Sequence, residues 1–280
     1  MFISPMLLQY SKNNEPFNKP NHISELKLDG FRLIVSNMDK LRLYTRHNNL
    51  VTNRFPELFE CPLPAGTIID GELIVEDPEG KPDFEALQAR FQSKKNKTPV
   101  SFCAFDIIKY KGIDVYGLPL MKRKEILEES FMGSQHYKKV KTFEGNAIDY
   151  FNLVSQHGLE GIVIKYKNSL YEINKRSWSW QKVINWTYVD VYISGYRKNE
   201  FGLLISIDDA TNGLKRNVGI VEFGVLPHHK EALRSVKKRL IYKEDANFAY
   251  MEPLIKARIK TRNWTKNGML RSPVFCEFLI

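Results

Sequence analysis

The chain has 280 residues, 43% of them hydrophobic and 12% aromatic, so it can bury a full core, which argues against a disordered protein. Its net charge of +10 favours a polyanionic partner, such as a nucleic acid, over a membrane or a cationic partner. The start of the chain lacks a signal-peptide pattern, and no run of roughly eighteen apolar residues provides a membrane span.

The three cysteines, Cys61, Cys103 and Cys276, lie far apart and match neither a zinc site nor a disulfide framework. This spacing indicates a reducing compartment. We therefore expect a cytoplasmic protein that is not secreted and, given its charge, is associated with the nucleoid.

Hydrophobic periodicity and turn residues predict a mixture of short strands and fewer helices. In chain order they are strands at 23–28, 31–36, 40–46 and 67–75, a helix at 83–92, a strand at 100–108, helices at 120–130 and 146–157, strands at 161–166, 188–196 and 202–208, a helix at 227–242, and strands at 254–262 and 270–279. Because strands and helices do not alternate regularly, we predict an α+β fold rather than a doubly wound parallel sheet.

A domain boundary is expected near residues 185–188, after the sequence WSWQKVIN. The predicted domains are 1–187 and 188–280, and the second is the more basic per residue, with sixteen Lys/Arg and ten Asp/Glu. Its order of strands, one helix and two further strands suits a small closed or partly open barrel such as an OB-fold.

The segment ELKLDGFR, residues 25–32, places two cations around a turn signal. Asp29-Gly30 between apolar residues predicts a tight hairpin in which Lys27 faces Arg32. Like charges opposite each other destabilise a sheet, so either both are solvated or an anion belongs between them. For Lys27 to act as a nucleophile its pKa must fall, and three units require about 4 kcal/mol, so a second cation or a metal is expected nearby.

KLDGFR resembles the K-x-D-G-x-R signature of the covalent nucleotidyltransferases, which include DNA ligases, RNA ligases and mRNA capping enzymes. Further segments resemble the other signatures of that superfamily in the same order: LYTRHNN (43–49), IIDGELIV (68–75), FCAFDII (102–108), LEGIVIK (159–165) and KRSWSWQKVI (175–184). VTNRFPEL (51–58) and DFEALQAR (83–90) are similar to connecting segments of ATP-dependent DNA ligases. The resemblance is therefore to a minimal ATP-dependent DNA ligase of the bacterial or phage type.

The resemblance implies roles for the residues around the nucleotide. Lys27 would attack the α-phosphate of ATP to form a lysyl-adenylate and release pyrophosphate. Glu25 would meet the adenine edge, Arg32 the ribose and Phe105 the adenine face. The remaining nucleotide-binding residues implied are Arg46, Glu72, Glu160, Lys165 and Lys182, of which Lys182 would neutralise the α-phosphate as the second cation near Lys27.

Two glutamates are candidates for the metal site. Glu72 and Glu160 each follow or precede a glycine, and we expect them at strand edges where backbone can approach a ligand. Carboxylates of this kind suit Mg²⁺, with Mn²⁺ as a substitute. The resemblance also implies that Asp29 acts in sealing, as a catalytic residue with Lys27 and Lys182, although the turn alone explains an aspartate there.

Basic residues recur at every second position in LIKARIKTRNW, near the end of the chain. On a strand, Lys256, Arg258, Lys260 and Arg262 share one face, while Ile255, Ala257 and Ile259 face the core. Such a face suits binding to a phosphate backbone without reading bases, or it is a solvated edge strand. Together with Arg46, which would bind the 5′-phosphate at a nick, these four residues are the predicted DNA-binding set.

The chain departs from the family pattern at two points. The fifth signature normally holds a second lysine, and Ile184 stands there. Arg271 fits the start of the sixth signature, but Leu279 occupies the place of its distal arginine.

The sequence therefore predicts an adenylation domain of antiparallel sheets flanked by helices, followed by an OB-fold domain. The predicted activity is ATP-dependent sealing of nicks in duplex DNA by a monomer, with no membrane contact and with no recruiting partner identified. Only 26 residues precede Lys27, which we interpret as a minimal two-domain enzyme. Alternatives are an RNA ligase, a capping-type guanylyltransferase, or a nick-binding module without catalysis.

Overall fold

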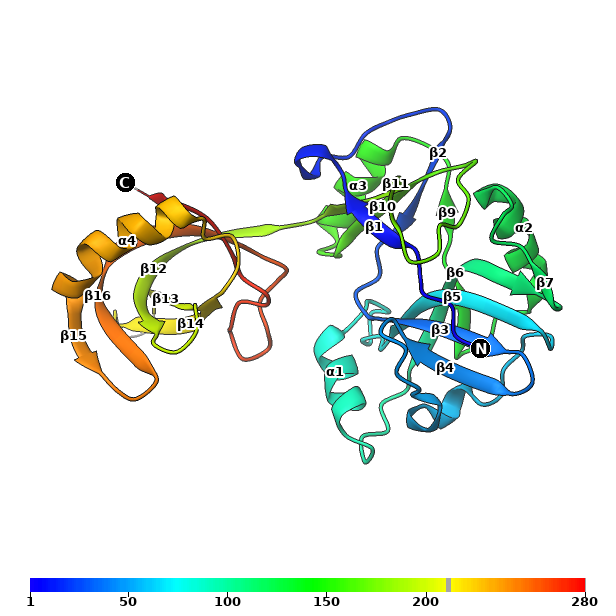
Figure 1. The fold of residues 1–280 in the computed structure, drawn as a ribbon, viewed down its shortest axis with the longest axis horizontal. Coiled ribbons are helices and arrows are strands. Elements are labelled where there is room, and N and C mark those ends of the chain that lie inside the picture. Colours follow the sequence, from blue (N-terminus) through cyan, green and yellow to red (C-terminus); the bar gives the residue numbers. More distant parts are fainter. Residues whose placement is uncertain (210–212, 280) are drawn as a thin grey trace. The chain divides into compact units, whose positions relative to one another are not determined.

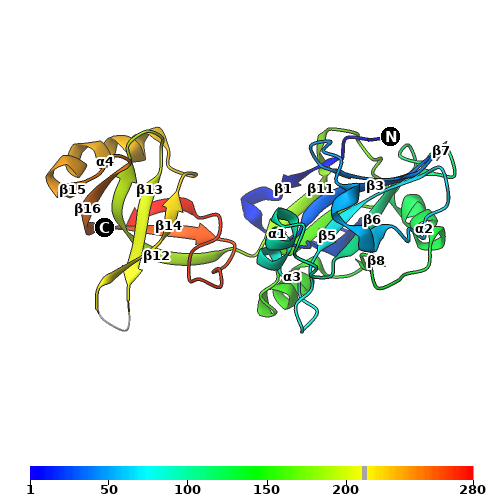
Figure 2. The same cartoon turned by 90° about the horizontal axis from the view of Figure 1, so that it is seen from below.

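The computed structural model describes residues 1–209 and 213–279 and divides the chain into two units, Met1–Asn185 and Trp186–Ile280. Figures 1 and 2 show both units as a mixture of sheets with few helices, which confirms the α+β class. Among the described residues, no helix has the length and apolar composition required to cross a membrane.

Unit 1 contains two sheets. Sheet 1 has the order β1 (Leu7–Tyr10), β11 (Arg176–Ile184), β10 (Gly161–Tyr166), β2 (His22–Leu26) and β9 (Thr142–Phe143). Sheet 2 has the order β4 (Leu41–Thr45), β3 (Phe31–Asn37), β5 (Thr67–Ile74), β6 (Ser101–Tyr110) and β7 (Ile113–Asp114), with β8 (Tyr137–Lys139) also on β6. Most pairs are antiparallel, as predicted, but β1 runs parallel to β11 and β8 parallel to β6.

Three helices belong to unit 1: α1 (Phe84–Gln92), α2 (Leu120–Ser130) and α3 (Ala147–Gln156). Short 3-10 turns occur at Lys12–Asn14, Thr52–Arg54 and Pro56–Leu58. The side chain of Asp83 accepts a hydrogen bond from the Ala86 amide and starts α1, and Asn146 does the same for the first amides of α3. In Figure 1, α3 lies beside β10 and α2 beside β6.

The core of unit 1 has a layer between the two sheets. Ile23 and Trp180 of sheet 1 pack there with Ile34, Ile68 and Ile108 of sheet 2. A second cluster, which includes residues of α1 and α2, lies against sheet 2, and α3 packs on sheet 1 through a third cluster. Since the facing sides of the two sheets share one core, side chains at its open edge can meet across the gap.

The predicted hairpin at Asp29-Gly30 is wrong. β2 pairs with β10 and β9, whereas β3 pairs with β4 and β5, so residues 27–30 carry the chain from sheet 1 to sheet 2. A Cβ at Gly30 would lie 2.2 Å from the Leu73 carbonyl oxygen, so glycine is required by close approach to β5 rather than by a type I′ turn.

Unit 2 contains one sheet, sheet 3, in the order β14 (Lys215–Val221), β13 (Leu203–Asp208), β12 (Thr187–Arg197), β16 (Phe248–Thr261) and β15 (Ile241–Glu244), with β17 (Val274–Leu279) also on β16. A bridge between Phe223 and Val274, with a 2.9 Å hydrogen bond from the Phe275 amide to the Phe223 carbonyl, brings the start of β17 to the chain just after β14. Sheet 3 therefore curves back towards its own edge.

The helix of unit 2, α4 (Pro227–Leu240), contributes Leu233 to the core that sheet 3 encloses. Both views show it near β15 and β16 (Figures 1 and 2). The predicted helix was two residues too long at its C-terminal end, because the chain continues directly into β15 at Ile241. The strands predicted at 254–262 and 270–279 begin at 248 and 274 instead.

Candidate active site

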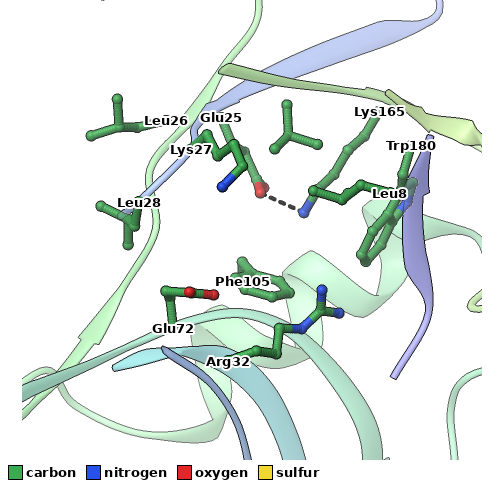
Figure 3. Close-up of a pocket in the computed structure, with 11 residues that line it drawn as sticks. Leu8, Glu25, Leu26, Lys27, Leu28, Arg32, Glu72, Phe105, Lys165 and Trp180 are labelled. Carbon is green, nitrogen blue, oxygen red and sulfur yellow. Dashed lines mark hydrogen bonds and ion pairs between the residues drawn. The ribbon is translucent and has the colours of Figure 1, made fainter. Parts of the chain in front are cut away.

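A pocket opens between sheets 1 and 2 of unit 1, and side chains from both sheets converge on it (Figure 3). It is lined by Leu8, Glu25, Leu26, Lys27, Leu28, Arg32, Glu72, Phe105, Val163, Lys165 and Trp180. The strands β2, β10 and β11 supply one wall, and β3, β5 and β6 supply the other. Six of the nine predicted nucleotide-binding residues are among these lining residues.

Lys27 lies directly after β2, where its amide donates a 2.9 Å hydrogen bond to the Gly161 carbonyl. Its amine Nζ is 2.7 Å from Glu160 Oε2, and the side chains are 19% and 7% exposed. The amine is thus held at one point by a carboxylate while remaining accessible from the pocket. The ion pair orients the amine beside the pocket, whereas the activating cation or metal expected from the sequence is a separate requirement.

Glu72 projects into the pocket from β5, where it is the cross-strand partner of Arg32. Burial raises the pKa of its carboxyl to about 8, although the nearby Lys27 and Arg32 cations act to lower it and Glu160 acts to raise it. Each cation of the segment 25–32 has a carboxylate partner other than Glu72: Glu160 for Lys27 and Asp70 for Arg32.

The expectation that Glu72 lies at a strand edge is wrong, because β5 pairs with β3 on one side and β6 on the other. A Cβ at Gly71 would lie 2.4 Å from the Phe102 ring and 2.6 Å from the Cys103 carbonyl oxygen. Gly71 is thus explained by packing within sheet 2. Glu160 does immediately precede a strand, β10.

Arg32 is fixed by a buried carboxylate that the sequence analysis did not single out. Its Nε and Nη2 lie 2.7 and 2.5 Å from the two oxygens of Asp70, and Tyr171 donates a 2.5 Å hydrogen bond to the same carboxylate. Burial alone would lower the pKa of Arg32, but Asp70 raises it above its ordinary value. The guanidinium carbon lies 4.7 Å from the centre of the Phe105 ring.

Glu25 and Lys165 form a buried ion pair, with 2.5 Å between Lys165 Nζ and Glu25 Oε2. Lys124 of α2 pairs with the other oxygen of Glu25. Burial lowers the pKa of Lys165 to about 8, despite the attraction of Glu25. The Lys165 amine also lies over the rings of Phe105 and Trp180, at 4.8 and 4.1 Å from their centres.

Lys182 lies beside the pocket rather than among its lining residues. In sheet 1 it is the partner of Val163, which is in turn the partner of Glu25, so these three share one face. Its amine is 3.9 Å from the centre of the Tyr10 ring. Ile184, which replaces the second lysine of the signature, pairs with Gly161 and is 1% exposed.

Besides Glu160 and Lys182, two further residues predicted for the unit 1 site lie outside the pocket lining. Arg46 is exposed in the turn after β4, and Asp29 lies in the link between the two sheets of unit 1.

The basic face of β16 alternates as predicted. Ala257 and Ile259 are fully buried, whereas Lys256, Arg258 and Lys260 lie on the opposite face. The Arg258 guanidinium is 2.8 Å from Asp190 and 3.9 Å from Glu277, so its charge is already matched by carboxylates. The Lys260 amine lies 5.1 Å from the centre of the Trp186 ring, and the guanidinium carbon of Arg262, just beyond β16, lies 4.6 Å from it.

The sequence analysis missed four residues of the site: Asp70, Lys124, Tyr171 and Trp180. Asp70 could have been found, because it lies two positions before Glu72 and so shares its face of the strand. Lys124 and Tyr171 carry no local signal, since their partners lie far away in the sequence.

The pocket combines an aromatic ring, several cations, two carboxylates and an amine held for reaction. This set fits a ligand with an aromatic base and phosphates, and defines a nucleotide-binding enzyme site. The family model described as ATP dependent DNA ligase domain matches residues 5–183. The chain belongs to the ATP-dependent DNA ligases, which confirms the resemblance drawn from its motifs.

Relatives support the same family. The SPbeta prophage-derived DNA ligase-like protein LigB of Bacillus subtilis is 44% identical over 277 residues, covering 98% of each chain. The multifunctional end-joining repair protein LigD of Mycobacterium tuberculosis is 27% identical over 267 residues, and the match spans 88% of this chain but 34% of LigD.

Solved structures show a matching fold. The ligase domain from M. tuberculosis LigD aligns over 99% of this chain and 95% of its own, with a TM-score of 0.59 and 25% identity. A Lig E DNA ligase, in a study of DNA binding with a minimal scaffold, aligns over 99% of this chain and 100% of its own, with a TM-score of 0.71 and 19% identity.

Proposed function

We propose that this chain seals nicks in duplex DNA with ATP, by way of an adenylate on Lys27 and an adenylated DNA 5′-phosphate. The observation that carries this proposal is the position of the Lys27 amine, 2.7 Å from Glu160 beside the pocket that Glu72, Arg32 and Phe105 line. Residues 1–187 would form the adenylation domain and residues 188–280 an OB-fold domain.

The first step joins Lys27 Nζ to the α-phosphorus of ATP and breaks the bond from that phosphorus to the bridging oxygen, so that pyrophosphate leaves. The amine must lose a proton before it attacks. Glu160 accepts a hydrogen bond from the amine and is therefore placed to orient it and to take part in that proton loss. Lys182, on the same face of sheet 1, would neutralise the α-phosphate.

The nucleotide would be held by groups whose own positions are fixed. The Phe105 ring offers a stacking face for adenine, and Asp70 holds Arg32 at the ribose. Glu25 would accept a hydrogen bond from the adenine edge, and its ion pairs with Lys165 and Lys124 would hold it in position. Lys165 would also stabilise the phosphates.

Glu72 and Glu160 are suited to hold a divalent cation, Mg²⁺ or Mn²⁺. Burial disfavours the ionised form of Glu72, and Glu160 adds a second negative charge, so a cation between them would be stabilising. Within the described residues there is no group of three or more His, Cys, Asp or Glu placed to hold a metal. Mg²⁺ bound by one or two carboxylates and by substrate phosphates needs no such cage, and it would neutralise charge on those phosphates.

In the later steps AMP moves from Lys27 to the 5′-phosphate at the nick, and the 3′-hydroxyl then attacks that phosphate and displaces AMP. Arg46 would bind the 5′-phosphate and Asp29 would assist sealing. The outward face of β16 would bind the DNA backbone through Lys256, Lys260 and the adjoining Arg262, the last two of which lie over the Trp186 ring. A monomer suffices for this scheme, and DNA binding would associate it with the nucleoid.

Nick sealing separates this proposal from its alternatives. A labelled duplex with one nick should be joined in the presence of ATP and Mg²⁺, and not with GTP. Preference for nicked RNA would indicate an RNA ligase, a guanylylated protein would indicate a capping-type enzyme, and DNA binding without joining would indicate a nick-binding module.

A further inference from the structure

Unit 2 carries a second cationic site, whose residues have no role assigned above. A surface pocket of about 390 Å³ lies between α4 and the connection from β12 to β13. It is lined by Tyr196, Arg197, Lys198, Asn199, Glu200, Phe201, Gly202, Leu203, Lys230, Leu233, Arg234 and Lys237. These include five cations and one carboxylate, so the pocket is strongly positive.

The cations from the helix share one face. Lys230, Leu233, Arg234 and Lys237 follow the i, i+3, i+4, i+7 spacing, and Leu233 anchors that face in the core of unit 2. Lys230 and Lys237 lie over aromatic rings, with their amines 3.9 and 4.0 Å from the centres of Phe201 and Tyr196. The rings fix the lysine side chains at the rim of the pocket.

The charges on this face of α4 are unmatched. Arg197 pairs with Glu200 and Glu222, and Lys198 pairs with Glu244. By contrast, in the described part of the chain no carboxylate lies within 4 Å of Lys230, Arg234 or Lys237. Helix stability accounts for Lys237 in the last turn, but it does not account for Lys230 in the first turn, which holds no acidic residue.

This pocket is distinct from the basic face of β16. Lys256, Arg258 and Lys260 point away from the core of unit 2, whereas Tyr196 and Phe201 pack against that core below α4. β12 pairs with the basic part of β16 through residues 188–192, and the pocket begins only at Tyr196, further along the strand.

We propose that this pocket is a second site for the DNA phosphate backbone, an inference that rests on the proposed action on DNA. The three helix cations span about 10 Å along α4, a length over which one DNA strand carries about three phosphates when measured along the duplex axis. An acidic protein partner is less well suited, because the lysine amines lie over the two rings of the pocket, which a protein partner would use as aromatic anchors. A site of this kind would hold DNA beyond the part bound by β16.

The test compares the salt dependence of DNA binding in matched variants. K230Q/R234Q/K237Q removes the three charges, and K238Q/R239Q/K243Q removes three exposed charges from α4 and β15 outside the pocket. Fluorescence anisotropy with a labelled nicked duplex, without ATP, should show weaker binding and a log K against log salt slope shallower by up to about 2.7 in the pocket variant only. Equal changes in both variants would overturn the site, because they would reflect net charge alone.

Two further measurements separate the explanations. K230R/K237R keeps the charges and should keep the slope. A loss of DNA affinity as large as in the glutamine variant would show that the lysines act through packing, which would contradict the proposal. If the pocket variant lost its binding to poly-glutamate and kept its binding to DNA, that result would assign the site to an acidic protein and overturn the proposal. Formation of the lysyl-adenylate, measured in parallel, tests the proposed function independently, because unit 1 holds the nucleotide pocket.

Discussion

Burial of the Glu72 carboxyl lowers the stability of the folded protein at neutral pH, and the same residue has a part in the proposed chemistry. Its carboxyl has a pKa of about 8 in the folded protein against an ordinary value of 4.5, because burial disfavours the charged form. The folded state therefore binds the proton more tightly than the unfolded state does. Stability from this group is complete below about pH 4.5 and is lost as the pH rises towards 8.

Replacing Glu72 with glutamine should remove this pH dependence. At pH 7.5, E72Q is expected to raise the free energy of unfolding by about 1–3 kcal/mol, or the melting temperature by a few degrees, and the gain should fall near zero at pH 4.5. The same variant should lose lysyl-adenylate formation, because the proposed metal ligand is gone. Thermal unfolding at the two pH values checks the first part, with exposed Glu79→Gln as the control. An equal gain at both pH values would contradict the account.

Asp70 supports the site through Arg32. The carboxylate is fully buried and is the partner of two guanidinium nitrogens and of Tyr171. D70N would leave a buried cation without its counter-charge, which typically costs about 3–5 kcal/mol. Chemical denaturation should show this loss, whereas D39N, which breaks the exposed Asp39–Arg42 pair, should leave stability nearly unchanged. Similar losses for both would mean that Arg32 does not depend on Asp70.

At the scale of elements, most strands and helices follow from local patterns. The helix α2 was predicted with its observed bounds, and β10 likewise, because periodicity and caps are local signals. Strand pairing is not local. Asp29-Gly30 has the composition of a hairpin turn, but β2 and β3 belong to different sheets, and their residues Ile23 and Ile34 pack in the core between those sheets.

The same limit applies to the site. The resemblance of short segments to the family signatures led to Lys27, Arg32, Glu72, Phe105 and Glu160, and the structure brings these residues together. It did not lead to Lys124, because pairing between α2 and β2 depends on the packing of the whole unit. The residues that position the site are thus harder to predict than the residues expected to react.

The basic face of β16 supports a graded prediction. Each phosphate contact should contribute about 0.9 to the slope of log K against log salt. K256Q and K260Q should each make the negative slope shallower by about that amount. R258Q should change it by less, because Asp190 and Glu277 already match the Arg258 charge. Salt titrations of nicked-duplex binding would measure this. If R258Q changed the slope more than K256Q and K260Q do, the Arg258 guanidinium would have to leave its carboxylates and contact the DNA.

At the scale of the molecule, the adenylation chemistry is proposed for unit 1 and most of the DNA binding for unit 2. Unit 1 holds the pocket with Lys27, and unit 2 presents the cationic surfaces. The cations behind the net charge of +10 are therefore clustered: some line the pocket of unit 1, and others lie on two surfaces of unit 2. This division explains how a chain of 280 residues can both activate a nucleotide and hold a polyanionic substrate.

The most direct measurement is the intact mass of the protein after incubation with ATP and Mg²⁺, followed by peptide mapping. The unchanged chain should gain one adenylyl group at Lys27. K27R keeps a cation opposite Glu160 but has no nucleophilic amine, so it should fold and gain nothing. An adduct that persists in K27R, or that maps to another lysine, would contradict the central claim that Lys27 is the residue that captures the nucleotide.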